Sequence, residues 1–226
     1  MKSDKQKDPA QKDIKFILNL LNSNELADAK KEIYKQIINF PNSSILFNIL
    51  GAVLANQKKL DKAIENYKKA LKINPNYAQA YNNLGIALHK LNKINEAIDC
   101  YKKALGIKKD FAEALNNMGN ATCELNKPED ALRYFKEAIQ IRSDFAEAYY
   151  SLGSACQDLG KKEEAENYYL TAIKIKPNYA EAYNNLGMLL NDQVRFDESL
   201  SSYKKAIALK PKYEKPYNNL GNLQSN

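Results

Sequence analysis

Asparagine recurs along this chain at a spacing that could support recognition chemistry. Adjacent Asn residues return every 34 residues, three and two places before a glycine such as Gly85. A short amide both donates and accepts hydrogen bonds, so a row of amides can pair with the backbone of an extended peptide whatever its side chains are. The first row holds Asn48, Asn82, Asn116, Tyr150, Asn184 and Asn218, and the second holds Ile49, Asn83, Asn117, Ser151, Asn185 and Asn219.

The two Asn rows have two explanations. A compositional bias would scatter Asn throughout this Asn-, Lys- and Ile-rich chain. The regular return of Asn to the same two positions argues for selection instead. We therefore interpret the rows as a sequence-tolerant peptide track.

Acidic residues follow the same period. The row that falls near the ends of predicted helices holds Glu124, Asp158 and Asp192. The row that falls in the first turn of predicted helices holds Glu113, Glu147 and Glu181. The helix dipole favours carboxylates in a first turn, which explains the second row without a function, but it disfavours them at a helix end. The acids predict that the later half of the track is acidic and prefers a basic peptide segment.

The other reactive side chains do not form a catalytic set. His89 is the one histidine and has no Cys or carboxylate at a useful spacing, so we expect it to contact a peptide or to have no role. Three cysteines, Cys100, Cys123 and Cys156, with no CxxC pair disfavour both a disulfide framework and a zinc site. No Ser/His/Asp set, P-loop or dinucleotide fingerprint occurs. The sequence predicts a protein that is not an enzyme and uses no metal or cofactor.

The elements that position these residues repeat with the same period. Glycine stands at Gly51, Gly85, Gly119, Gly153, Gly187 and Gly221, every one 34 residues from the next. A fixed period of this length is the signature of a solenoid, in which each repeat buries its apolar face against its neighbours. We number the positions of a repeat 1 to 34, with this glycine at position 8. The five complete repeats are 44–77, 78–111, 112–145, 146–179 and 180–213.

Each repeat contains two amphipathic segments. Positions 4, 7, 8 and 11 share one face of a first helix, and positions 20, 24 and 27 share one face of a second. In the second repeat the main members are Tyr81, Leu84, Gly85, Ala97, Tyr101 and Ala104. Glycine at position 8 and Ala at position 20 should let the helices approach, with aromatic rings at positions 4 and 24 filling the gaps beside them. The repeat is therefore predicted to be an antiparallel helical hairpin.

This pattern resembles the tetratricopeptide repeat. The matching signature is aromatic-x-x-Leu-Gly, then Ala-x-x-x-Tyr/Phe-x-x-Ala and Pro, in one phase over residues 44–213. The resemblance implies an all-α fold, a right-handed α–α superhelix of helical hairpins, with the first helices lining a concave groove. It also implies that positions 2, 5, 6, 9, 12 and 13 face the groove, which includes Asn120 at position 9.

Two functional comparisons follow from the resemblance. The Asn rows are similar to those lining the repeat superhelix of O-linked N-acetylglucosamine transferases. Other tetratricopeptide domains clamp a partner's terminal carboxylate through Lys, Asn and Arg at set positions. Here only the position 6 Asn residues and Asn120 match, and the cations are absent. A carboxylate clamp is therefore disfavoured.

The two ends of the chain depart from the repeat. Residues 1–9 are predicted to be a disordered leader, with Asp8 as the N-cap of the first helix. Residues 10–43 form a degenerate capping hairpin in which Ile17 replaces the glycine. Residues 214–226 supply a first helix without its partner. Either this helix closes the array imperfectly, or the chain is cut from a longer protein.

Composition limits the classes of partner. The chain has 226 residues, a net charge of +7 and 27% charged residues, and no stretch is apolar enough for a membrane span. Its lysines concentrate on second helices and turns, where they form a solvated face. Arginine is scarce and no aromatic residues are interleaved there, which disfavours specific nucleic-acid recognition. These features predict a cytoplasmic protein that binds neither membrane nor specific nucleic acid.

Three functions are compatible with the sequence. The first is a non-catalytic scaffold that binds an extended peptide or partner segment in its concave groove. The second is the substrate-recruiting arm of a larger enzyme, such as a glycosyltransferase, whose catalytic domain is not in this chain. The third is self-association through the last, uncapped helix.

Overall fold

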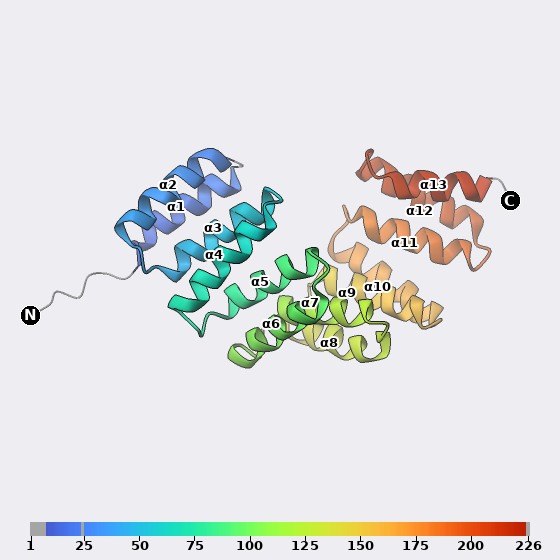
Figure 1. Cartoon of the computed structure of the whole chain (residues 1–226). Helices are drawn as coiled ribbons and strands as arrows, with labels where there is room; N and C mark the ends of the chain where they lie inside the picture. Colours follow the sequence, from blue (N-terminus) through green and yellow to red (C-terminus); the bar gives the residue numbers. More distant parts are fainter. Residues whose placement is uncertain (1–7, 24, 225–226) are drawn as a thin grey trace, which may run out of the picture. The chain divides into compact units, whose positions relative to one another are not determined.

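The computed structural model describes residues 8–23 and 25–224, and within these ranges the chain forms thirteen helices and no strand (Figure 1). The residues divide into two compact units, 1–109 and 110–226. Unit 1 contains α1 (Gln11–Asn22), α2 (Leu26–Asn39), α3 (Ser44–Asn56), α4 (Leu60–Ile73), α5 (Ala78–Lys90) and α6 (Ile94–Ile107). Unit 2 contains α7 (Ala112–Glu124), α8 (Pro128–Ile141), α9 (Ala146–Asp158), α10 (Lys162–Ile175), α11 (Ala180–Asn191), α12 (Phe196–Leu209) and α13 (Glu214–Gln224).

Each complete repeat is a hairpin of one odd-numbered and one even-numbered helix, as the sequence predicts. Helices of 11 to 14 residues are marginal alone in water, so packing must stabilise them. The glycine at position 8 permits this packing because the ring at position 24 lies directly on it. A Cβ added at Gly119 would stand 2.5 Å from Cε1 of Phe135, and one at Gly85 would stand 2.5 Å from Cε1 of Tyr101. The ring therefore occupies the place of the missing side chain rather than a gap beside it.

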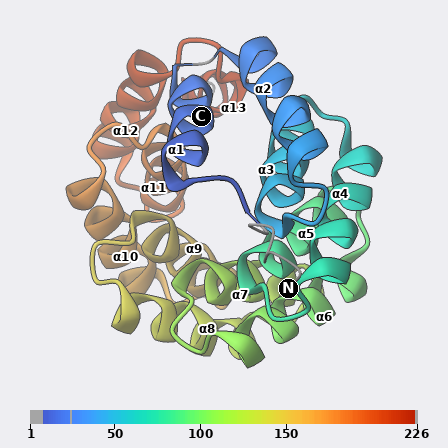
Figure 2. The same ribbon diagram turned by 90° about the vertical axis from the view of Figure 1, so that its left-hand side faces the viewer.

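The helices of each unit form two layers. In Figure 2, α3 and α5 lie on one side of unit 1 with α4 and α6 on the other, and α9 and α11 are separated in the same way from α10 and α12. The pairs α3 and α5, α7 and α9, α9 and α11, and α11 and α13 approach each other closely, whereas α1 and α3 do not. Consecutive even-numbered helices make no such close approach in the described residues. The odd-numbered side is thus the more closely spaced one. We call the odd-numbered helices the inner layer and the even-numbered helices the outer layer.

The core lies between the layers. In unit 2, one cluster joins three repeats through Phe135, Leu152, Cys156, Tyr169 and Leu189, all at most 1% exposed. Small residues at positions 20 and 27, such as Ala165, keep the helices close enough for these rings to interdigitate. Because each repeat supplies only part of this cluster, stability depends on the neighbouring repeats.

The turn inside each hairpin uses a left-handed residue at position 15. The φ angles are 60° at Lys58, 61° at Asn92, 56° at Asn126, 71° at Gly160 and 63° at Val194. Asn and Gly adopt this conformation readily, whereas a β-branched residue does so at a cost. Val194 is therefore the strained member of the set.

The ends of the chain follow the predicted hairpin boundaries with one correction. Residues 1–7 of the expected leader lie outside the described residues. Pro9 is buried, and the Oδ1 atom of Asp8 accepts a hydrogen bond of 2.6 Å from Oγ of Ser43. The prediction that Asp8 caps the first helix is wrong, because α1 begins at Gln11 after Ala10 and has no side-chain cap.

Candidate functional site

Four of the five amides of the first Asn row are buried in the inner layer. Asn48, Asn82, Asn116 and Asn184 are 7%, 2%, 7% and 1% exposed, respectively. For Asn48, Asn116 and Asn184, the next odd-numbered helix of the same unit lies against the helix that carries them. We expected the whole row to face a bound peptide. Instead, these four amides are buried by packing between the helices.

Bonds between the two rows connect successive repeats. In unit 1, Nδ2 of Asn83 donates to Oδ1 of Asn48 over 3.0 Å. The amide of Asn48 in turn donates to the hydroxyl of Tyr77 at 3.3 Å. A position 6 side chain thus reaches back 35 residues to position 5 of the preceding repeat. We call such a bond an amide bridge.

Unit 2 contains two more amide bridges. Asn185 donates to the hydroxyl of Tyr150 at 3.1 Å, and Asn219 donates to Oδ1 of Asn184 at 3.0 Å. The ring of Tyr150 also lies 5.1 Å from that of Tyr179 and 6.0 Å from that of Tyr169. Tyrosine can therefore replace Asn at position 5 because its oxygen still accepts the bridge.

One amide bridge is missing in unit 2. The acceptor would be Asn116, whose Oδ1 atom is buried and has no hydrogen-bond partner. The donor position of the next repeat is occupied by Ser151, which is buried and carries a side chain shorter than Asn. The presence of Ser rather than Asn at position 6 explains the unpaired oxygen. A buried acceptor without a hydrogen bond lowers the free energy of unfolding.

The accessible part of the inner layer in unit 2 consists mainly of polar side chains at positions 6, 9 and 12, together with Met188. We call it the inner surface, and its members are Asn117, Asn120, Ser154, Gln157, Asn185, Met188 and Asn191. All are half-buried except Met188, which is 39% exposed. The other expected contact residues are placed as follows: Asn83, Tyr150, Asn219 and His89 are half-buried, and Asn218 is exposed.

The position 13 acids lie at the ends of three consecutive inner-layer helices. Glu124 ends α7, Asp158 ends α9 and Asp192 follows α11, and all three are exposed. Desolvation raises the pKa of Asp158 above its ordinary value. Burial raises the pKa of Cys123 to about 11, with further contributions from Asp158 and Glu124. The acids of α7 and α9 therefore lie close enough to act on the same thiol.

The position 2 acids are neutralised by cations that the sequence interpretation missed. Glu113 pairs with Arg142, Glu147 with Lys176 and Glu181 with Lys210, each at 2.7 Å. Each cation also lies over the aromatic ring at position 34 of its repeat, at 3.6 Å for Arg142 and Phe145. These glutamates therefore add no free charge to the acidic region, and the expectation that they do is corrected. The 29-residue spacing between acid and cation was the signal available in the sequence.

The pKa values of two of these glutamates reflect the pairing. Desolvation acts to raise the pKa of Glu147, but the hydrogen bond from Lys176 and its charge lower it overall. Desolvation and Lys210 oppose each other in the same way at Glu181, whose pKa is also lowered. Both carboxylates are thus held in the charged form.

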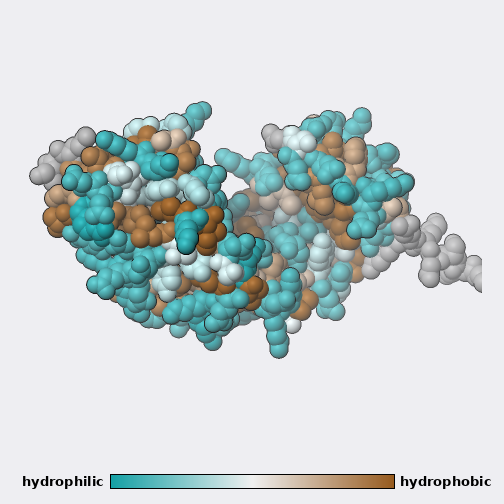
Figure 3. Space-filling view, turned by 180° about the vertical axis from the view of Figure 1, so that it is seen from behind, coloured by the Kyte–Doolittle hydropathy of each residue, from teal (hydrophilic) through white to brown (hydrophobic). Residues whose placement is uncertain are grey.

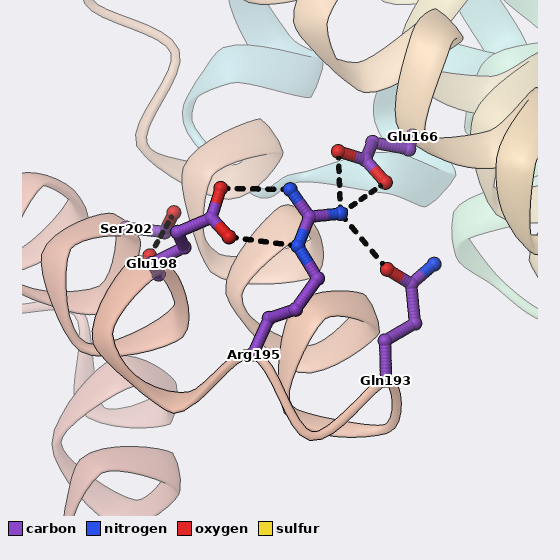
Figure 4. A network of polar contacts seen from close by, with 5 residues as sticks. All are labelled: Glu166, Gln193, Arg195, Glu198 and Ser202. Carbon is purple, nitrogen blue, oxygen red and sulfur yellow. Dashed lines mark hydrogen bonds and ion pairs between the residues drawn. The ribbon is translucent and has the colours of Figure 1, made fainter.

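An arginine in the fifth hairpin turn connects the outer layer of unit 2 (Figure 4). Arg195 makes a two-bond contact with Glu198 of α12 at 2.8 and 2.7 Å, and its Nη1 atom donates to both carboxylate oxygens of Glu166 of α10. Gln193 accepts a further bond of 3.0 Å from the same nitrogen. The network thus joins α10 and α12, which both pack against α11.

Other kinds of site were sought in the described residues. No three His, Cys, Asp or Glu side chains come together there as a metal site. None of the described helices is long and apolar enough to cross a membrane. On the face shown in Figure 3, hydrophobic atoms lie in several groups among hydrophilic ones. The arrangement of the inner surface therefore points to polar recognition.

Family comparisons cover most of the repeated region. A TPR repeat family matches residues 51–92, and tetratricopeptide repeat families match residues 78–111, 110–178 and 144–212. Together these matches extend from residue 51 to residue 212. No curated protein matches the chain.

Solved structures agree with the family matches. MamA is 30% identical, with a TM-score of 0.61 over 73% of this chain and 96% of its own. YrrB is 23% identical, with a TM-score of 0.60 over 83% and 96% of the two chains. PilF of Pseudomonas aeruginosa is 19% identical, with a TM-score of 0.79 over 93% and 96%. The chain therefore belongs to the tetratricopeptide repeat family.

Proposed function

We propose that the inner surface of unit 2 binds an extended, basic segment of a protein partner. Tetratricopeptide repeat proteins generally act as scaffolds for protein interactions, and YrrB is described as having an unusual peptide-binding site. The proposal adds the place and the chemistry of binding to this general role.

The observation that carries the proposal is the acidic row at position 13. A carboxylate is unfavourable at a helix C-terminus, yet three consecutive inner-layer helices of unit 2 end in one. Asp158 is also partly desolvated and forms no ion pair in the described residues. A Lys or Arg side chain of a partner would supply the cation that Asp158 lacks.

The amides have a more limited role than a continuous track. Asn185 already donates one N–H to Tyr150, and Asn184 donates to its Oδ1. Gln157 accepts a hydrogen bond from the hydroxyl of Tyr169, and the Oδ1 atom of Asn191 is buried. The half-buried side chains of Asn120 and Ser154 lie between these positions. We propose that these amides fix the peptide in an extended form while the acids select basic side chains.

The test compares two triple variants with equal changes in charge. The first changes the position 13 acids, Glu124→Gln, Asp158→Asn and Asp192→Asn. The second changes exposed acids of the outer layer, Glu129→Gln, Glu163→Gln and Asp197→Asn. The probe is a capped twelve-residue peptide of alternating Lys and Thr, titrated calorimetrically into the full chain. Three surface charge pairs of about 0.5 kcal/mol each predict roughly tenfold weaker binding for the first variant.

Two outcomes would contradict the proposal. One is equal weakening in both triple variants, which would show attraction to net charge alone. The other is unchanged binding by the first variant when its circular dichroism spectrum matches that of the unchanged protein. A capped peptide of alternating Glu and Thr should not bind.

We also propose that α13 is a contact surface for a second copy of the chain. In α13, Tyr217 is 47% exposed, and no described atom beyond the neighbouring backbone of α13 lies within 4 Å of a Cβ added at Gly221. In five repeats the equivalent glycine is covered by an aromatic ring. Light scattering over a hundredfold concentration range should show association that Tyr217→Lys reduces, and a monomer at all concentrations would rule it out.

A further inference from the structure

A cavity of about 580 Å³ opens on unit 1 beside the turn between α2 and α3. Its lining residues are Pro41, Asn42, Phe47, Lys69, Lys72 and Ile73. Lys69, Lys72 and Ile73 lie on the outer-layer helix α4, and Phe47 lies on α3. The cavity is in unit 1 and shares no residue with the inner surface of unit 2. Its lining combines apolar side chains with those of two lysines.

The two lysines have no acidic partner. Neither Lys69 nor Lys72 forms an ion pair in the part of unit 1 that the structure describes. Lys69 instead lies with its ammonium nitrogen 5.9 Å from the centre of the Phe47 ring. In unit 2, by contrast, Lys176 and Lys210 at the ends of the outer-layer helices are each paired with a glutamate. The cavity therefore carries uncompensated positive charge.

The charge around the cavity is part of a larger asymmetry. Residues 1–109 contain 20 Lys, no Arg and 10 acidic residues, which gives a net charge of +10. Residues 110–226 contain 14 basic and 17 acidic residues, which gives −3. The field of unit 1 thus attracts an anionic partner, while unit 2 does not.

We propose that this cavity is a docking site for an acidic segment of a protein partner. One apolar side chain of the segment enters between Phe47 and Ile73, and flanking carboxylates contact Lys69 and Lys72. A nucleic-acid backbone would satisfy the lysines but leave the apolar floor empty, and the absence of Arg from this unit removes the side chain best suited to phosphate and base contacts. The occupant that uses both parts of the lining is an acidic peptide with an aromatic or aliphatic residue.

The experiment titrates the full chain with a capped Asp-Glu-Phe-Asp-Glu peptide and with its Asp-Glu-Ala-Asp-Glu counterpart. The test variant is Lys69→Glu with Lys72→Glu, and the matched control is Lys204→Glu with Lys205→Glu on α12 of unit 2. All four lysines are exposed, so both variants should fold. We expect the Phe peptide to bind the unchanged chain and the control equally, and to bind the test variant about tenfold or more weakly. The Ala peptide should bind the unchanged chain more weakly than the Phe peptide does.

Several results would overturn the proposal. Equal losses in both variants would show that net charge alone attracts the peptide, and equal affinity for the Ala peptide would show that the cavity is not filled. Tighter binding of duplex DNA or of phosphatidylserine vesicles, lost in the same test variant, would assign the site to that occupant instead. The position 13 variant should leave the affinity for this acidic peptide unchanged or higher, so failure here is separable from failure of the inner surface.

Discussion

Val194 holds a backbone conformation that suits asparagine or glycine. Its φ angle is 63°, in a turn where the second and third repeats use Asn92 and Asn126 and the fourth uses Gly160. A left-handed conformation costs a residue with a Cβ about 1–2 kcal/mol, and β-branching crowds it further. The side chain is 70% exposed, so packing of the side chain does not offset this strain.

Replacing Val194 by Asn should therefore stabilise the protein by roughly 1 kcal/mol. The reverse exchange, Asn126→Val, introduces the same backbone strain into the turn of the third repeat. It should destabilise the protein by a similar amount. Urea unfolding followed by circular dichroism measures both changes. If the two variants shift the midpoint in the same direction, backbone strain is not the cause.

The unpaired Asn116 oxygen leads to a second residue-level prediction. Ser151→Asn places an amide donor where the other repeats have one, and the restored amide bridge should add about 1 kcal/mol to stability. Ser154→Asn puts the same new side chain one turn later on α9, on the inner surface, and should have little effect. A Ser151→Asn protein no more stable than the Ser154→Asn protein would show that Asn116 is already satisfied by water.

At this scale the sequence predicted where the amides recur but not how they are used. Spacing showed that positions 5 and 6 share one face of a helix. It did not show that position 6 of one repeat reaches position 5 of the repeat before it, because that depends on how closely the inner-layer helices approach. Asn83 and Asn48, 35 residues apart, contact each other only after the repeats have stacked.

The hairpin itself depends on the glycine at position 8. Gly119→Ala would bring a Cβ to 2.5 Å from Phe135, whose ring is fully buried, and overpacking of this kind costs roughly 1–3 kcal/mol. Gly221→Ala changes the same repeat position in α13, where no atom lies within 4 Å of the new Cβ, and helix propensity should make it neutral or stabilising. Thermal unfolding of the two variants compares them directly, and equal losses would contradict the packing explanation.

The ion pairs of unit 2 predict that the stability of the fold depends on pH. The pKa values of Glu147 and Glu181 are lowered from the ordinary 4.5 in the folded state, so their contribution is full above pH 4.5 and is lost as pH falls through the lower folded values. The pairs are largely exposed, which limits each to a few tenths of a kcal/mol. Glu147→Gln with Glu181→Gln should lower the urea midpoint more at pH 7 than at pH 3. A constant difference between the two proteins from pH 3 to pH 7 would rule out these carboxylates as the source.

At the scale of the element, the sequence predicted the hairpins because apolar periodicity and the glycine period agree in five consecutive repeats. It erred where a single polar residue had alternative partners. Asp8 had the sequence context of a helix cap, yet it bonds to Ser43, which is 35 residues away. Local rules cannot anticipate a partner supplied by the next hairpin.

At the scale of the whole molecule, a net charge of +7 conceals two units of opposite sign. The family could be predicted from the sequence because its signature is a matter of spacing. The candidate sites could be predicted only in part. The position 13 acids stand out in a repeat alignment, whereas the cavity at Phe47 and Lys69 requires the turn of one repeat to meet the outer helix of the next.

The missing amide bridge has a consequence for how such a chain gains and loses repeats. Deletion of residues 146–179 removes one whole repeat and keeps the 34-residue period. Asn185 would then stand at position 6 of the repeat after Asn116, and its amide could donate to the Asn116 oxygen. Deletion of residues 180–213 removes the same number of residues. It keeps Ser151 at position 6 of the repeat after Asn116, so the Oδ1 atom of Asn116 stays unpaired. The first shortened protein should be the more stable by about 1–3 kcal/mol in urea unfolding. The junction between the third and fourth repeats is thus the one at which loss of a repeat restores an amide bridge.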